Sequence, residues 1–142
     1  MSRGYSRIVA RRWEGIVPEA VPPLSGCRVL VVEDEYLIAS EVKRWLHSAG
    51  AEVIGPVPRA DLALDLIAEQ TPDAAVLDVN LGDGNSVYPV AERLGVLGVP
   101  YLFATGDVRV TGAPAEASRP ILEKPFVAAE LVRAVTRLVA AA

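Results

Sequence analysis

Short apolar runs rich in β-branched residues alternate with helical segments along most of this chain, and the alternation limits the folds open to it. Residues 28–33 (RVLVVE) have strand length, and residues 36–48 place apolar side chains at helical spacing before Gly50 ends the segment. The same patterns predict strands at 52–55, 73–78, 100–105 and 120–124, and helices around 62–67, 87–94 and 127–140. Because the strands are continuously apolar rather than alternating, they predict a parallel sheet with helices on both faces.

Composition sets the broad class of the protein. The chain has 142 residues, 51% hydrophobic and 23% charged, which fits one globular domain with a short appendage. Its net charge of -4 argues against binding DNA through a general basic surface. The sequence has neither a membrane-spanning apolar stretch nor a secretory signal. We therefore expect a cytoplasmic protein that does not contact DNA directly.

The N-terminal 25 residues differ from the rest. They carry four arginines and two glutamates, a balance of +2, so the other 117 residues carry -6. Prolines at positions 18, 22 and 23 indicate a linker, and we place the boundary at Ser25, between a basic, proline-containing arm (1–25) and a domain (26–142). The arm has an apolar set, Ile8, Val9, Trp13, Ile16 and Val17, but a helix this short is marginal alone. We expect a mobile or loosely docked tail.

The fourth βα unit is the weakest. Residues 106–119 (GDVRVTGAPAEASR) contain two glycines, a proline and little helical periodicity. We expect a fourth helix that is short or irregular.

Polar residues stand at the ends of four of the predicted strands. The first strand ends in Glu33, Asp34 and Glu35, the third in Asp78, the fourth in Thr105, and the fifth in Glu123 and Lys124. The carboxyl ends of parallel strands meet at one edge, where functional groups gather. Clustered carboxylates repel one another, and a bound cation would relieve that repulsion. With one cysteine (Cys27) and one histidine (His47) there is no zinc set, so oxygen ligands favour Mg²⁺ or Mn²⁺.

This set of residues also suits phosphoryl chemistry. A carboxylate beside such a metal can act as a nucleophile and form an acyl phosphate. A lysine such as Lys124 and a hydroxyl such as Thr105 can then stabilise the charge on the transferring phosphoryl oxygens.

Four motifs stand in order on these elements: VVEDE (31–35), VLDVNLGDG (76–84), FATG (103–106) and EKPF (123–126). Together they resemble the receiver domain of two-component response regulators, over about 115 residues. The resemblance implies a flavodoxin-like, doubly wound five-stranded sheet of order 2-1-3-4-5. It also implies that Asp78 accepts a phosphoryl group from a phosphohistidine, so the protein is a phosphoacceptor rather than an enzyme.

The resemblance implies roles for the other site residues. Glu33 and Asp34 align with the family's acidic pair and would bind Mg²⁺ with Asp78 and the backbone carbonyl of Asn80. Thr105 would be the switch hydroxyl and Lys124 the phosphate-pairing lysine, followed by Pro125 after a bond that is usually cis.

Two positions depart from the family pattern. Ile121 stands where many receivers have an aromatic residue that moves with the switch hydroxyl, so the switch must be built differently. PYLFATG resembles a subgroup common in alphaproteobacteria, with Pro-Phe-x-Phe-Ala-Thr-Gly-Tyr in the fourth strand, but Asp107 replaces its tyrosine. The match to this subgroup is partial.

We interpret the chain as a stand-alone receiver whose partner is a histidine kinase or a phosphotransfer protein. It could signal by protein contact, by onward phosphotransfer or as a phosphate sink. The face around the fourth helix and fifth strand is a candidate partner or homodimer surface, expected to include Phe103, Val108, Val110 and Ile121. The alternative is a receiver-like interaction module that works without phosphorylation. A phosphohydrolase would need an acid where Asn80 stands.

Overall fold

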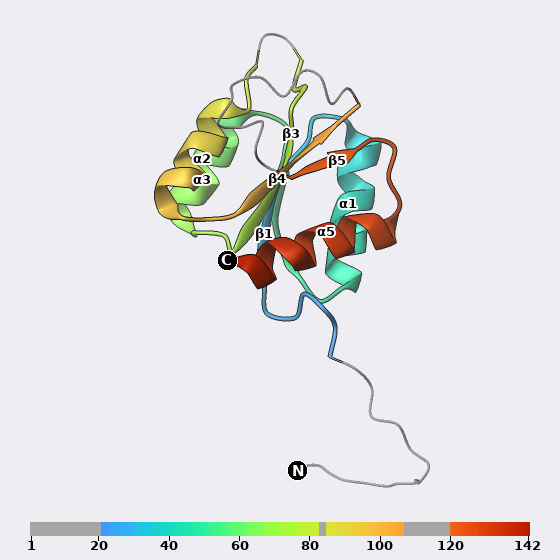
Figure 1. Cartoon of the computed structure of the whole chain (residues 1–142). Coiled ribbons are helices and arrows are strands. Elements are labelled where there is room, and N and C mark those ends of the chain that lie inside the picture. Colours follow the sequence, from blue (N-terminus) through green and yellow to red (C-terminus); the bar gives the residue numbers. More distant parts are fainter. Residues whose placement is uncertain (1–20, 83–84, 107–119) are drawn as a thin grey trace, which may run out of the picture.

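The computed structural model describes residues 21–82, 85–106 and 120–142. The elements, with the labels of Figure 1, are β1 (Arg28–Val32), α1 (Tyr36–Ser48), β2 (Glu52–Val57), α2 (Ala60–Glu69), β3 (Ala74–Asp78), α3 (Tyr88–Leu97), β4 (Tyr101–Thr105), β5 (Ile121–Glu123) and α5 (Ala128–Ala141). Each predicted strand and helix within the described ranges is present, with ends that differ by a few residues.

The five strands form one parallel sheet in the order β2-β1-β3-β4-β5. Helices α1 and α5 cover one face, and α2 and α3 cover the other (Figure 1). The flavodoxin-like fold and its strand order are therefore confirmed. The irregular fourth helix, Asp107, Val108 and Val110 lie outside the described residues.

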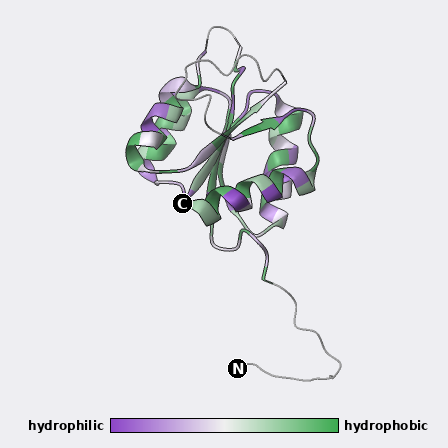
Figure 2. Cartoon of the chain, in the orientation of Figure 1, coloured by the Kyte–Doolittle hydropathy of each residue, from purple (hydrophilic) through white to green (hydrophobic). Residues whose placement is uncertain are grey.

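The burial of the strands explains their sequences. Every residue of β3 and β4 is buried, and so are four of the five residues of β1, because helices cover both faces of the central strands. The edge strands β2 and β5 are only partly buried. In Figure 2 the hydrophobic colour follows the strands, whereas the helices show both colours.

Each face of the sheet has its own core. On one face Leu30, Leu77 and Phe103 pack under α2 and α3, and on the other Val31 and Leu102 pack under α1 and α5. Phe103 has no solvent-exposed surface, so the expectation that it belongs to a partner surface is wrong. Ile121 is half-buried against the same core. The homodimer through this face stays a prediction.

Residues 22–25 pack against the end of α1. Leu24 is fully buried, and its amide donates to the Ala49 carbonyl oxygen at 2.9 Å. None of the helices in the described ranges is both long enough and apolar enough to cross a membrane.

Candidate functional site

The carboxyl edge of the sheet brings together side chains from three strand ends. Glu33 and Asp34 follow β1, Asp78 ends β3 and Lys124 follows β5. These side chains come together because β1 is the neighbour of β3, and only β4 separates β3 from β5. The predicted convergence of acids and lysine at this edge is therefore observed.

Asp78 is the most deeply buried acid of this set, with 2% of its surface exposed. Its Oδ1 accepts hydrogen bonds from the Asn80 amide at 3.1 Å and from Lys124 Nζ at 3.3 Å. Burial, and then the charge of Glu33, raise its pKa to about 7, although the Asn80 amide and Lys124 act in the opposite direction. Near neutral pH this carboxylate is therefore easily protonated unless another cation joins Lys124.

Lys124 binds two carboxylates at once. Its Nζ lies 3.0 Å from Glu33 Oε1 and 3.3 Å from Asp78 Oδ1. Burial alone would lower its pKa, but the hydrogen bond and charge of Glu33, with the charge of Asp78, raise it above the ordinary value. The ammonium therefore stays charged and stands beside the Asp78 oxygens. The bond from Lys124 to Pro125 is cis, as the resemblance implies.

The donor set fits a hard divalent cation. Glu33, Asp34 and Asp78 each offer a carboxylate oxygen, and the three oxygens lie within 4.8 Å of one another. Asp34 is exposed and the other two are buried, so a cation could bind three protein oxygens and still keep water ligands, as Mg²⁺ prefers. Gly82, in the left-handed conformation (φ 73°), brings the loop after β3 beside Asp34: a Cβ there would lie 3.5 Å from Asp34 Oδ2.

The two other predicted residues lie at the same edge. The backbone N–H of Asn80 donates to Asp78 Oδ1, and this hydrogen bond spans the turn just after the strand end. Thr105 is buried at the end of β4, and its carbonyl oxygen accepts a hydrogen bond from the Lys124 amide at 2.8 Å. Thr105 and Lys124 are thus tied together through the backbone.

Sequence reasoning missed a pocket of about 340 Å³ beside this site. Its lining residues come from α1 and from the segment before α5: Glu35, Ile38, Glu41, Trp45, Lys124, Pro125 and Phe126. Trp45 is half-buried and packs edge-on against Phe126, with ring centroids 6.3 Å apart. The spacing of Ile38, Glu41 and Trp45 on one helix face was the available signal.

Comparison with known proteins agrees with this architecture. The family model for the response regulator receiver domain matches residues 29–136. Transcriptional regulatory protein PrrA of Mycobacterium tuberculosis is 40% identical over 116 residues, covering 78% of this chain and 49% of PrrA. The chain thus spans about half the length of this relative.

Solved structures give the same result. The solution structure of SdrG from Sphingomonas melonis Fr1 is 35% identical with a TM-score of 0.70, covering 82% of this chain and 98% of that one. The response regulator PhyR from Brucella abortus is 27% identical with a TM-score of 0.72, covering 84% of this chain and 50% of PhyR.

The fold and the acidic edge define a flavodoxin-like α/β domain with an oxygen-lined site. With the family match, the chain belongs to the response regulator receiver domains of two-component signalling. Members of this family are phosphoacceptors that work with histidine kinases or phosphotransfer proteins and typically bind Mg²⁺ at an acidic pocket.

Proposed function

We propose that this protein accepts a phosphoryl group on Asp78, in a Mg²⁺-dependent reaction, from a phosphohistidine of a histidine kinase or phosphotransfer protein. It then signals by protein contact or by passing the group onward. One observation carries the proposal: a buried strand-end carboxylate, Asp78, is bound by Lys124 and stands within reach of the Glu33 and Asp34 oxygens.

The chemistry needs a carboxylate nucleophile. An Asp78 oxygen attacks phosphorus, the phosphorus–nitrogen bond of the phosphohistidine breaks, and its electron pair stays on the imidazole. The second ring nitrogen of the histidine takes up a proton from solvent, so the products are an acyl phosphate on Asp78 and a neutral imidazole. Lys124 is already held at the Asp78 oxygen by its two ion pairs, so it can shift from Asp78 to a phosphoryl oxygen without a long movement.

Glu33, Asp34, Asp78 and the Asn80 carbonyl would hold the Mg²⁺ ion. Bound there, the ion would neutralise the crowded carboxylates and the incoming phosphoryl oxygens. Without it, the burial of Asp78 and then the charge of Glu33 favour protonation of Asp78, which weakens the nucleophile.

Thr105 is proposed as the switch hydroxyl. It ends the buried strand β4 and is linked through its carbonyl to Lys124, so a shift of either residue is passed to the other. Ile121 lies in register with Phe103 on the neighbouring strand. Because residue 121 is aliphatic, the switch in this chain does not use the aromatic movement described for many receivers.

The phosphodonor needs a surface beside Asp78. Tyr36 and Leu37 at the start of α1 are 80% and 77% exposed, and Val127 before α5 is 60% exposed. These positions follow the strand ends that carry Glu33, Asp34 and Lys124, and exposed apolar patches beside a site are typical of contact surfaces. We assign the docking of the kinase or phosphotransfer protein to these residues.

The test is intact-mass spectrometry of the protein after incubation with Mg²⁺ and acetyl phosphate or an autophosphorylated histidine kinase. A single phosphoryl adduct is expected for the wild type and for the control Asp65→Asn, whose residue is exposed on α2. The adduct should be absent from Asp78→Asn and after chelation of Mg²⁺. No adduct with any donor, despite Mg²⁺ binding, would favour the interaction module that works without phosphorylation.

A further inference from the structure

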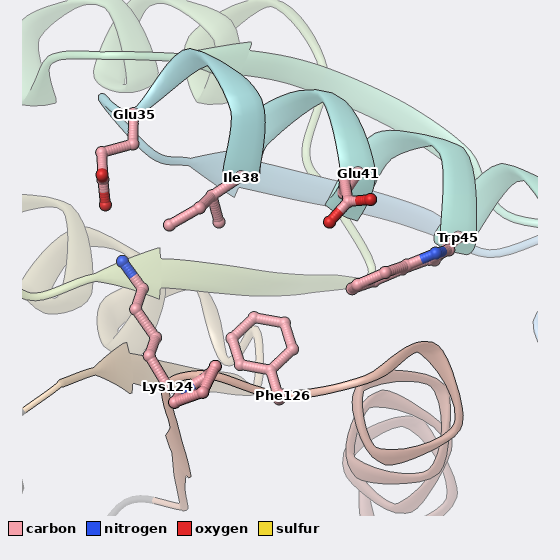
Figure 3. A pocket seen from close by; sticks show the side chains of 7 residues that line it. Glu35, Ile38, Glu41, Trp45, Lys124 and Phe126 are labelled. Carbon is pink, nitrogen blue, oxygen red and sulfur yellow. The ribbon is translucent and has the colours of Figure 1, made fainter.

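An apolar groove runs along the α1 side of the molecule and ends beside the acidic site. Figure 3 shows its upper part, with Ile38 and Trp45 of α1 facing Phe126 and with Glu35 and Lys124 at one end. A second hollow, lined by Pro23, Trp45, Ala129 and Val132 among others, continues it toward the start of the described chain. Trp45 lines both hollows, so they adjoin at this side chain between α1 and the start of α5, and the pair is called the groove below.

The chain itself enters at the lower end of this groove. Pro23 lines the second hollow, and Leu24 is fixed there by burial and by its hydrogen bond to Ala49. Whatever precedes Val21 therefore begins beside the groove. A segment tethered this closely has an effective concentration on the order of millimolar, which favours it over a free partner of similar affinity.

The arm has the chemistry that the groove requires. Its apolar residues match an apolar floor, and its arginines, at positions 3, 7, 11 and 12, match the two carboxylates on the α1 rim. Glu41 already pairs with Arg44 at 3.2 Å, but the Glu35 carboxylate has no ion pair with any residue the structure describes. We infer that residues 8–17 of this chain occupy the groove, with Trp13 packed on the floor and Arg11 and Arg12 beside Glu35.

Length does not limit this arrangement. The groove follows α1 from Ser48 to Glu35, roughly 20 Å at 1.5 Å per residue. The 20 residues before Val21 could span about 66 Å when extended. The segment 8–17 thus reaches the Glu35 end even if the residues between it and Val21 turn back on themselves.

The inference has a consequence that rests on the proposed function. The upper end of the groove adjoins Lys124, which binds Asp78, and Tyr36 and Leu37 begin the same helix. An arm in the groove would hinder the phosphodonor, so deletion of residues 1–20 should raise the rate of phosphotransfer from the kinase. Transfer from acetyl phosphate, which needs no docking surface, should change much less.

The direct test uses the full chain, unphosphorylated and without Mg²⁺, so that its outcome does not depend on Asp78 chemistry. A nitroxide label is attached at Ser6→Cys in a Cys27→Ala background, and amide signals are compared with the label oxidised and reduced. Loss of signal is expected at Ile38 and Phe126, whereas Val96 and Leu97, on the α3 face of the sheet, should be unaffected.

Two variants make the test specific. Trp13→Ala should restore the signals and the matched aromatic control Tyr5→Ala should not. Ala129→Arg places bulk and positive charge at an exposed groove position; it should also restore them, with its melting temperature checked to confirm folding. The inference would be overturned if no signals were lost, or if signals were lost uniformly over the protein. It would also be overturned if neither Trp13→Ala nor Ala129→Arg restored the lost signals. Loss found only between labelled and unlabelled copies would also overturn it, because a second copy would then be the occupant.

Discussion

Asp78 is a carboxylate whose surroundings oppose its charge. Its pKa is about 7 in the folded protein and close to the ordinary 3.8 when unfolded, so the folded state binds the extra proton between these values. The resulting contribution to the free energy of unfolding is present at low pH and is lost as pH rises toward 7 and above. In metal-free buffer, Asp78→Asn should therefore be more stable than the wild type at pH 8 and similar near pH 4.

Urea unfolding of both proteins across this range, with a chelator present, measures the difference. The exposed Asp65→Asn variant should show no such pH-dependent gain. A stability difference between Asp78→Asn and the wild type that stays constant from pH 4 to pH 8 would contradict the proposed effect of burial and Glu33.

Asp34 is the exposed member of the acidic cluster, so its substitution leaves the core intact. At neutral pH, Mg²⁺ should raise the melting temperature of the wild type, because binding to the folded state stabilises it by mass action. Asp34→Asn should lose most of this increase, and Asp65→Asn should keep it. Equal shifts in all three proteins, measured by differential scanning fluorimetry, would place the ion elsewhere.

The sequence predicted which residues lie at the site better than it predicted the contacts between them. The strand-end positions of Asp78, Glu33 and Lys124 follow from parallel topology, which the continuous apolar runs already indicate. The shorter contact of Lys124 with Glu33 than with Asp78 could not be predicted, because it depends on side-chain orientations within a shared buried pocket.

At the scale of elements, strand β4 shows why the Phe103 expectation failed. A residue on a central parallel strand faces one helix layer or the other, so neither side is free for a partner. Phe103 also contacts Tyr88 and Tyr101 edge-on, with centroids 5.8 and 5.5 Å apart. Phe103→Ala should lower the free energy of unfolding by about 3–5 kcal/mol, whereas the exposed Val96→Ala should change it little; chemical denaturation measures both. If Phe103→Ala left the free energy of unfolding almost unchanged, the Phe103 side chain would not be part of the core.

The turn after α1 fixes residues 22–25, which form the C-terminal end of the arm. Gly50 has φ +99°, and a Cβ there would lie 2.8 Å from Pro22 Cβ and 3.0 Å from the Ser25 backbone. Gly50→Ala should therefore cost at least about 1–2 kcal/mol from the left-handed conformation alone. Gly95→Ala, with open space around its Cβ in α3, should instead gain about 0.5–1 kcal/mol. Equal effects in thermal unfolding would contradict the close packing of this turn.

For the whole molecule, the continuous apolar runs predicted a parallel sheet between two helix layers, and the resemblance to receiver domains implied the order of its strands. It did not predict the groove along α1, because that groove forms only when the segment after β5 lies against the helix, a long-range contact with no local signal. Trp45 and Phe126 are 81 positions apart in the sequence and meet edge-on in the fold. Local sequence patterns thus predict the receiver fold, whereas its partner surfaces arise from tertiary packing.

The central claim is that Asp78 carries the phosphoryl group. Reduction of the phosphorylated protein with borohydride converts an aspartyl phosphate into homoserine, and peptide mass spectrometry then locates that residue. We predict homoserine at position 78 alone, formed only when both Mg²⁺ and the phosphodonor were present. Homoserine at Asp34 or another carboxylate, or phosphate retained on a hydroxyl or histidine, would contradict the account.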